Sequence, residues 1–124
     1  MIFIALERTI NSQELALALA GILDKKQAKD IRILDVRKTS SITDFHILAT
    51  GTSGPHLRAL AEDLRQQLKD MGMPGYRTTG TPDSGWIVSD CVDVIAHLFS
   101  PEARAYYDLD SLWRDAPAVP FEAI

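Results

Sequence analysis

The chain has little cysteine and no long hydrophobic run. Cys91 is the sole cysteine among its 124 residues, which excludes a disulfide within the chain, a Cys-x-x-Cys zinc site and dithiol redox chemistry. The longest apolar stretch, Leu15 to Leu23, contains a glycine and is shorter than the roughly 20 apolar residues of a membrane-spanning helix. Glu7 and Arg8 interrupt the apolar start before it reaches signal-peptide length. These features predict a cytoplasmic protein with no membrane contact.

Basic charge is also scarce. Lys and Arg number 13 against 17 Asp and Glu, and the formal net charge is -4. Because affinity for nucleic acid comes mainly from Lys and Arg that neutralise phosphates, we expect no direct sequence-specific nucleic-acid binding. A basic protein is a more suitable partner. The length fits one domain, and 46% hydrophobic and 24% charged residues are typical of a folded globular protein.

Hydrophobic periodicity predicts alternating helices and strands. Asn11 and Glu14 form a capping-box pattern, after which apolar residues recur at helical spacing. The segment Gly51-Thr52-Ser53-Gly54-Pro55 offers a hydroxyl cap and an early proline to a second long helix, which Gly72 ends. This order predicts an α/β fold of three layers, a mixed sheet flanked by helices. The expected helices cover 12–27, 55–71, 101–107 and 109–114, and the expected strands cover 31–37, 44–50, 76–79, 86–90 and 93–99.

The Gly51–Gly54 segment is the first candidate for chemistry. Backbone N–H groups between a strand and a helix can hold an anion, but the Walker lysine and the Gly-x-Gly-x-x-Gly spacing are missing, so a helix cap is favoured. Nucleotidyl transfer would also need paired carboxylates to hold two metal ions. Asp90 and Asp93 would lie on opposite faces of a regular strand, and Asp108 and Asp110 lie where the chain leaves a helix. A nucleotidyltransferase-like enzyme or nucleotide-binding module remains the alternative function.

The histidines and the cysteine do not form a recognisable metal or catalytic motif. His46, His56 and His97 lack two-histidine helical spacing, and hydrogen-bonded histidines on a sheet are favoured for His46 and His97. Cys91 has no basic neighbour in sequence that would lower its pKa, so a buried or turn thiol is favoured. We predict no metal site and no cofactor.

Aromatic residues are better candidates for function. Trp86 follows a glycine-rich loop at the start of a predicted strand, where a large aromatic can be presented to a partner. For Trp113, and for one of Tyr106 and Tyr107, a place in the hydrophobic core is favoured.

Four motifs, in order, resemble the ribosomal silencing factor family, also called the Iojap-like family. The resemblance covers about residues 12–115, preceded by an N-terminal extension, 1–11, and followed by a tail, 116–124, expected to be flexible. The motifs are Ser40-Ser41-Ile42-Thr43-Asp44-Phe45, Ala49-Thr50-Gly51-Thr52-Ser53 with His56, Gly85-Trp86-Ile87-Val88-Ser89-Asp90 with Asp93-Val94-Ile95-Ala96-His97, and Arg104-Ala105-Tyr106-Tyr107-Asp108-Leu109-Asp110-Ser111-Leu112-Trp113.

The resemblance implies a fold similar to nucleotidyltransferases without their catalytic residues, and therefore a protein that is not an enzyme. It further implies a homodimer that binds the fourteenth protein of the large ribosomal subunit. Such binding would sterically block association of the ribosomal subunits and repress translation. Five residues are expected to bind the partner or to shape the binding surface: Trp86, Asp44, Asp90, Asp93 and Tyr107.

Two positions depart from the usual family pattern. The family carries Glu-Gly before the tryptophan and Gly-Asp in the hairpin turn, whereas this chain has Thr79-Gly80 and Val92-Asp93. The missing glutamate puts one salt bridge to a basic partner in doubt. Valine at position 92 predicts a turn that needs no positive φ.

Overall fold

The computed structural model describes residues 10–73 and 76–121, so most of the expected N-terminal extension lies outside the described residues. The expected helices and strands are present with small shifts of their ends, and the strand expected at 76–79 spans Arg77–Thr81. Within the described residues, no helix is both long and apolar enough to cross a membrane. The elements are α2 (Ser12–Lys25), β1 (Lys29–Asp35), β2 (Phe45–Thr50), α3 (Gly54–Asp70), β3 (Arg77–Thr81), η1 (Pro82–Ser84), β4 (Trp86–Asp90), β5 (Val94–Phe99), α4 (Pro101–Tyr107) and α5 (Leu109–Leu112).

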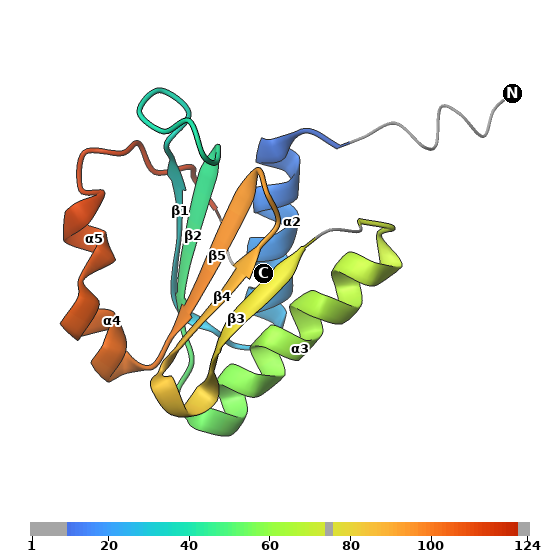
Figure 1. Ribbon diagram of the computed structural model, residues 1–124, viewed down its shortest axis with the longest axis vertical. Coiled ribbons are helices and arrows are strands. Elements are labelled where there is room, and N and C mark those ends of the chain that lie inside the picture. The colour runs from blue at the N-terminus through green and yellow to red at the C-terminus, as the bar shows by residue number, and fades with distance from the viewer. Residues whose placement is uncertain (1–9, 74–75, 122–124) are drawn as a thin grey trace, which may run out of the picture.

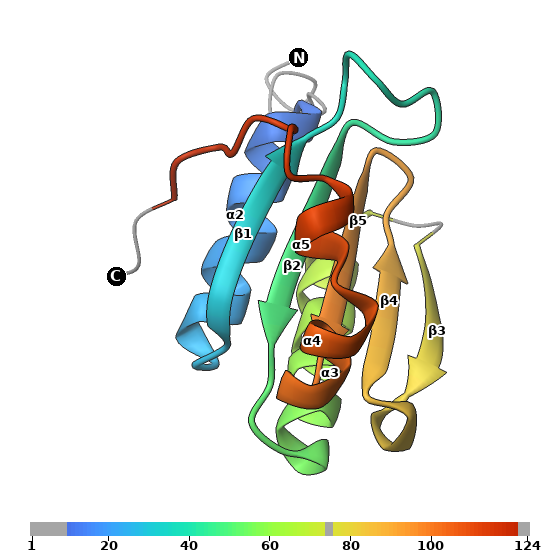
Figure 2. The same cartoon turned by 90° about the vertical axis from the view of Figure 1, so that its left-hand side faces the viewer.

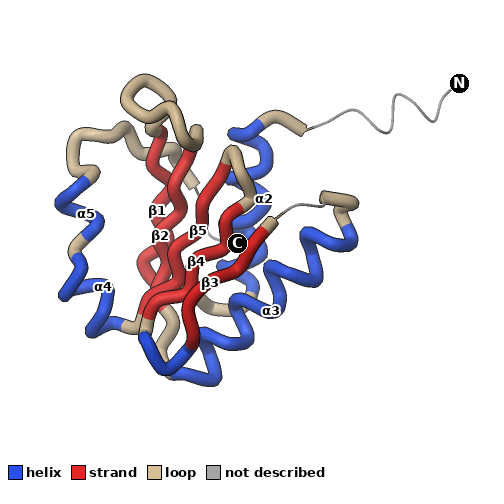
Figure 3. Tube along the Cα trace, in the orientation of Figure 1, coloured by secondary structure: helices blue, strands red, loops and turns tan. Residues whose placement is uncertain are grey.

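The strands form one mixed sheet in the order β1-β2-β5-β4-β3. The central pair β2 and β5 is parallel, the other pairs are antiparallel, and β4 and β5 form the expected hairpin. Helices α2 and α3 lie on one face of the sheet and α4 and α5 on the other (Figure 1; Figure 3). The prediction of a three-layer α/β domain is confirmed.

The larger core lies between the sheet and the two long helices. The capping box of Asn11 and Glu14 begins α2 through two backbone-to-side-chain hydrogen bonds of 2.8 and 2.9 Å. Leucines at helical spacing then face the sheet from α2 and α3, and burying each one stabilises the fold by about 1.5 to 3 kcal/mol before entropy is counted. The buried leucines of the two helices are Leu15, Leu19, Leu23, Leu57, Leu60, Leu64 and Leu68.

The other face of the sheet is only partly covered. A smaller core lies between this face and the two short helices, and it consists of Leu34, Leu48 and Phe99 of the sheet and Ala103 of α4. Figure 2 shows these two short helices over the middle of the sheet, with β4 and β3 uncovered beside them. This uncovered part of the sheet is where the candidate site lies.

The segment after α5 differs from the flexible tail expected there. The Asp35 N–H donates to the Pro117 carbonyl and the Val119 N–H donates to the Ile33 carbonyl, both at 2.8 Å. Val119 and Phe121 also pack against the larger core. The free edge of β1 explains the difference, because its unpaired backbone groups can pair with an extended segment that lies beside them. Residues 122–124 of the expected tail lie outside the described part of the chain.

The turn between β4 and β5 corrects a second expectation. Val92 has a φ of 72°, so the prediction that this turn needs no positive φ is wrong. The turn imposes the conformation: the Cys91 N–H donates to the Val94 carbonyl at 2.8 Å, and the Asp90 Oδ1 accepts the Val92 N–H at 2.9 Å. A β-branched residue is strained in this region of φ and ψ. Val92 is 61% exposed, so the strain comes from its own backbone and not from tight packing against neighbours.

Candidate functional site

The uncovered side chains of β3, β4 and β5 form a continuous surface, which we call the open face. It includes Trp86, Val88 and Asp90 of β4 and Ile95 of β5. On β3 it includes Thr79 and, by the strand register, Arg77 beside Asp90 and Thr81 beside Trp86. Cross-strand pairing places Thr79 beside Val88, and Asp90 beside Ile95. Burial alternates along β4, where the three residues of the open face are half-buried and the two between them are buried. The open face therefore has an apolar centre that the short helices leave accessible to solvent.

Trp86 and Tyr107 meet at one end of the open face, here called the aromatic end. Their ring centroids are 4.6 Å apart, and the Trp86 ring also lies 5.2 Å from that of Phe99. Trp86 is half-buried: one part of its ring packs against the smaller core, and the rest is exposed to solvent. Tyr106 is 82% and Tyr107 46% exposed, so the expectation that one of these tyrosines belongs to the core is wrong. The short α4 presents both rings at its surface.

A groove of about 550 Å³ adjoins the aromatic end. It runs between η1 and α4, and both tyrosines line it together with Asp83 and Glu102. Asp83 and Glu102 are far apart in the sequence, so no sequence pattern identified them as candidate site residues. The groove extends the accessible surface beyond the sheet and adds negative charge to it.

The three aspartates expected at the site lie at the other end of the hairpin, here called the acidic end. The Asp44 N–H donates to the Asp93 carbonyl at 3.0 Å, and the Asp90 side chain caps the turn that precedes Asp93. Trp86 and Asp90 are the first and last residues of β4, so their backbones are separated by roughly 13 Å at the usual rise per residue. The structure thus divides the five expected residues into an aromatic pair and an acidic trio.

A hydrogen-bonded chain of side chains runs beneath the aromatic end. The Trp86 Nε1 lies 3.2 Å from the His97 Nδ1, and the His97 Nε2 lies 3.1 Å from the His46 Nδ1. The His46 ring stacks on Trp113 at 3.9 Å. Burial lowers the pKa of His46 to about 4, and burial followed by the neighbouring His46 lowers that of His97 to about 3. Both rings are therefore neutral at neutral pH, and the prediction of hydrogen-bonded sheet histidines is confirmed.

The Gly51–Gly54 segment uses its polar groups within the fold. The Thr52 N–H donates to the His56 Nδ1 at 2.9 Å, and the Ser53 Oγ accepts the His56 N–H at 3.1 Å. The His56 Nε2 lies 2.7 Å from the Lys26 carbonyl and donates to it, which ties α3 to the end of α2. These contacts support the helix-cap interpretation over an anion site. Sequence reasoning missed this role of His56.

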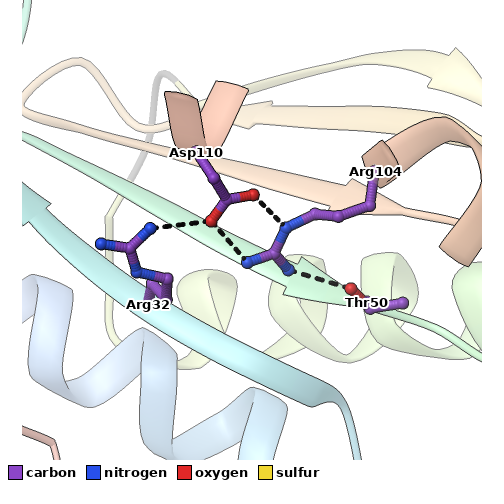
Figure 4. Close-up of polar contacts among 4 residues, drawn as sticks. All are labelled: Arg32, Thr50, Arg104 and Asp110. Atoms are coloured by element: carbon purple, nitrogen blue, oxygen red, sulfur yellow. Dashed lines mark hydrogen bonds and ion pairs between the residues drawn. The ribbon is translucent and has the colours of Figure 1, made fainter. Parts of the chain in front are cut away.

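A polar network fastens α4 and α5 to the sheet (Figure 4). Asp110 accepts hydrogen bonds from Arg104 at 2.7 and 3.1 Å and from Arg32 at 2.8 Å. Arg104 also donates to the Thr50 Oγ1 at 2.9 Å. Hydrogen bonding from Arg104, followed by that from Arg32, lowers the pKa of Asp110 to about 2. The network fixes the corner that carries Tyr107, and so it sets the geometry of the aromatic end.

Other reactive groups are inert or dispersed. Burial, followed by the nearby Asp90, raises the pKa of the Cys91 thiol to about 11, as expected for a buried thiol. In residues 10–73 and 76–121, no three or more of the His, Cys, Asp and Glu side chains are grouped so that they could hold a metal ion.

Comparisons with known proteins decide the family. A family model described as "Ribosomal silencing factor during starvation" matches residues 9–124. The chain belongs to the ribosomal silencing factor family. A silencing factor from Halalkalibacterium halodurans is 32% identical over 115 residues, which are 93% of this chain and 98% of the relative. The resemblance found in the sequence motifs is thereby confirmed.

Two further similar proteins extend the comparison. A crystal structure from Chromobacterium violaceum has a TM-score of 0.80 and 31% sequence identity, and the match covers 93% of this chain and 94% of that one. A mouse protein named "Mitochondrial assembly of ribosomal large subunit protein 1" is 31% identical over 98 residues, which are 77% of this chain and 43% of the mouse protein.

Both departures from the usual silencing factor pattern lie at the candidate site. Thr79, where the family carries glutamate, is exposed and pairs with Val88 in the middle of the open face. Val92, where the resemblance implies glycine, has a positive φ, a conformation that glycine adopts without strain. Thr79 thus places a hydroxyl where the resemblance implies a negative charge.

Proposed function

We propose that this chain is a silencing factor that binds the large ribosomal subunit through its fourteenth protein and blocks association with the small subunit. The observation that carries the proposal is the family match over residues 9–124. The name of the mouse relative, which refers to assembly of the large ribosomal subunit, supports the choice of subunit. The chain acts in the cytoplasm, where the subunits meet.

We propose the open face, with its aromatic and acidic ends, as the docking surface. Its half-buried apolar centre, Val88 and Ile95, would be desolvated by a partner, and Trp86 beside it has the side chain most enriched in interface hot spots. The acidic end would meet Lys or Arg of a basic ribosomal protein and would disfavour the surrounding RNA. The surface thus combines an apolar centre with a charged rim, as protein interfaces commonly do.

The proposed mechanism is steric. A domain of this length has a radius of gyration of about 14 Å, so one copy bound at the subunit interface could occlude contacts between the subunits. No bond is made or broken, and the protein is not an enzyme. A homodimer is part of the proposal: all five residues of β3 are exposed at the edge of the sheet, and a second copy could cover that edge.

Co-sedimentation with isolated large subunits tests the proposal. The unmodified chain is expected in the ribosomal pellet, and the double variant Asp90→Asn, Asp93→Asn is expected to bind roughly three- to tenfold more weakly, since rim charge pairs each contribute up to about 1 kcal/mol. Asparagine can still accept the Val92 N–H, so the turn is preserved. The affinity of the unmodified chain should also fall with added salt more steeply than that of the variant.

The matched control removes two charges from the far side of the sheet. Asp63→Asn with Asp70→Asn changes α3, which faces away from the docking surface. This control should bind like the unmodified chain. An unmodified chain that stays in the supernatant would refute the binding proposal, and equal weakening by the two double variants would refute the docking surface.

A further inference from the structure

We propose that His97 is a positioning residue for partner binding: it accepts the Trp86 indole N–H and so fixes the ring that the docking surface presents. The inference rests on the proposed function, because it concerns the same surface and the same partner. His97 does not itself belong to that surface, since it is only 7% exposed. Its role is therefore exerted through Trp86.

The direction of the hydrogen bonds follows from the chemistry of the groups. The indole nitrogen only donates, so the His97 Nδ1, 3.2 Å away, carries no proton. A neutral His97 then has its proton on Nε2 and donates to the His46 Nδ1 at 3.1 Å. The result is a one-way chain from Trp86 through His97 to His46. A ring flip of His97 would break both bonds, so the chain selects a single orientation of this residue.

Packing against neighbouring rings holds His97, the acceptor of the Trp86 N–H, in place. The His97 ring lies nearly parallel to Phe99, with 9° between planes and 6.1 Å between centroids. At the far end His46 is stacked on Trp113, with an interplanar angle of 15°. His97 stands on the central strand β5 and His46 on β2, so the acceptor is carried by the most buried part of the sheet.

A fixed tryptophan can bind with a smaller entropy loss. Trp86 is half-buried, with Tyr107 against its ring and His97 on its nitrogen. Without the acceptor, the indole would lose its polar anchor and would sample more orientations before binding. Immobilising a side chain at an interface has a cost that corresponds to roughly two- to tenfold in affinity. We expect loss of the His97 acceptor to weaken partner binding by this factor.

Two substitutions of His97 separate the acceptor from the donor. In His97→Asn, the amide oxygen takes the place of Nδ1, so Trp86 keeps its partner while the bond to His46 is lost. In His97→Gln, the longer side chain places its amide nitrogen near the Nε2 position, so His46 keeps its donor while Trp86 loses its acceptor. Both amides are polar, and both variants bury a similar group. The comparison therefore isolates the contact with Trp86.

The test combines affinity for the isolated fourteenth ribosomal protein with the NMR signals of the indole N–H groups. The chain contains two tryptophans, so the spectrum has two indole N–H signals, and the signal that is missing from the spectrum of Trp86→Phe is that of Trp86. His97→Gln should shift the Trp86 indole signal, speed its exchange with water and weaken binding roughly two- to tenfold. His97→Asn should retain the signal and the affinity. If His97→Gln does not fold, His97→Leu also removes the acceptor, leaves Trp86 in place, and should shift the same signal and weaken binding by the same factor.

Each outcome decides the inference. Equal affinity of the unmodified chain and His97→Gln, with the indole signal shifted, would overturn it, as would equal losses in the Asn and Gln variants. Full affinity of a folded His97→Leu variant would also overturn it. If the unmodified chain does not bind the ribosomal protein, the proposed function fails and the inference fails with it. Normal binding by the unmodified chain and by His97→Gln refutes the inference alone.

Discussion

Replacement of Trp86 by alanine is expected to release the chain from large ribosomal subunits and to lower its free energy of unfolding by about 2 kcal/mol. The binding loss should be roughly 30-fold or more, because truncating an interface hot spot costs about 2 kcal/mol or more. The folding loss follows from contacts with Phe99, Tyr107 and His97. It should be smaller than the 3 to 5 kcal/mol of a fully buried tryptophan, because this ring is half-buried.

Trp113→Ala is the control for this variant. Trp113 is also half-buried and packs against the same smaller core, but its ring stacks on His46 and not on Trp86. Its replacement should destabilise the fold by a similar amount, but because it leaves the Trp86 ring and its His97 partner in the chain, it should weaken binding far less than Trp86→Ala does. Urea unfolding and co-sedimentation, both measured where each variant is folded, separate the two effects. Undiminished binding by Trp86→Ala, or equal loss of binding by both variants, would contradict the account.

Asp110→Asn is expected to lower the free energy of unfolding by about 2 kcal/mol at neutral pH. The substitution removes the carboxylate that pairs with Arg104 and Arg32, and Arg104 is only 13% exposed in its side chain. Hydrogen bonds to charged groups each contribute about 1.5 to 3 kcal/mol, and asparagine can replace only part of them. Because the network holds α4 and α5, the variant should also loosen the aromatic end.

The pH dependence of the free energy of unfolding tests whether the ionised Asp110 carboxylate is the source of the lost stability. The pKa of Asp110 is lowered to about 2 in the folded chain, so its stabilisation is fully present above about pH 4 and is lost as the pH falls toward 2. Urea unfolding should therefore show a gap between the unmodified chain and Asp110→Asn that closes over this range. Asp108→Asn is the control, since Asp108 is exposed and asparagine accepts its positive φ. A gap independent of pH would contradict this prediction.

The repeating elements of the fold could be predicted because their signals are local. The capping box of Asn11 and Glu14 and the leucine spacing of α2 and α3 depend on residues within one or two turns. The pairing of residues 117–119 with β1 could not be predicted, because nothing in the tail itself shows that a free strand edge lies beside it. The positive φ of Val92 was missed because valine rarely adopts it and the closure of the hairpin imposes it.

The sequence predicted which residues belong to the candidate site better than it predicted how they are arranged. Family motifs pointed to Trp86 and to the aspartates, but the division into an aromatic end and an acidic end depends on strand register. Arg32 and Asp110 are 78 positions apart, and no local pattern links them. The half-burial of Trp86 depends on how far α4 extends across the sheet. These features are long-range, so they emerge only when the chain is folded.

The most direct test of the central claim is a subunit-joining assay. Isolated large subunits are saturated with the chain and mixed with small subunits, and light scattering follows the formation of joined ribosomes. The account predicts that the scattering increase falls as the bound fraction of large subunits rises, and that Trp86→Ala restores it while Trp113→Ala does not. Undiminished joining by large subunits that are saturated with the chain would contradict the account.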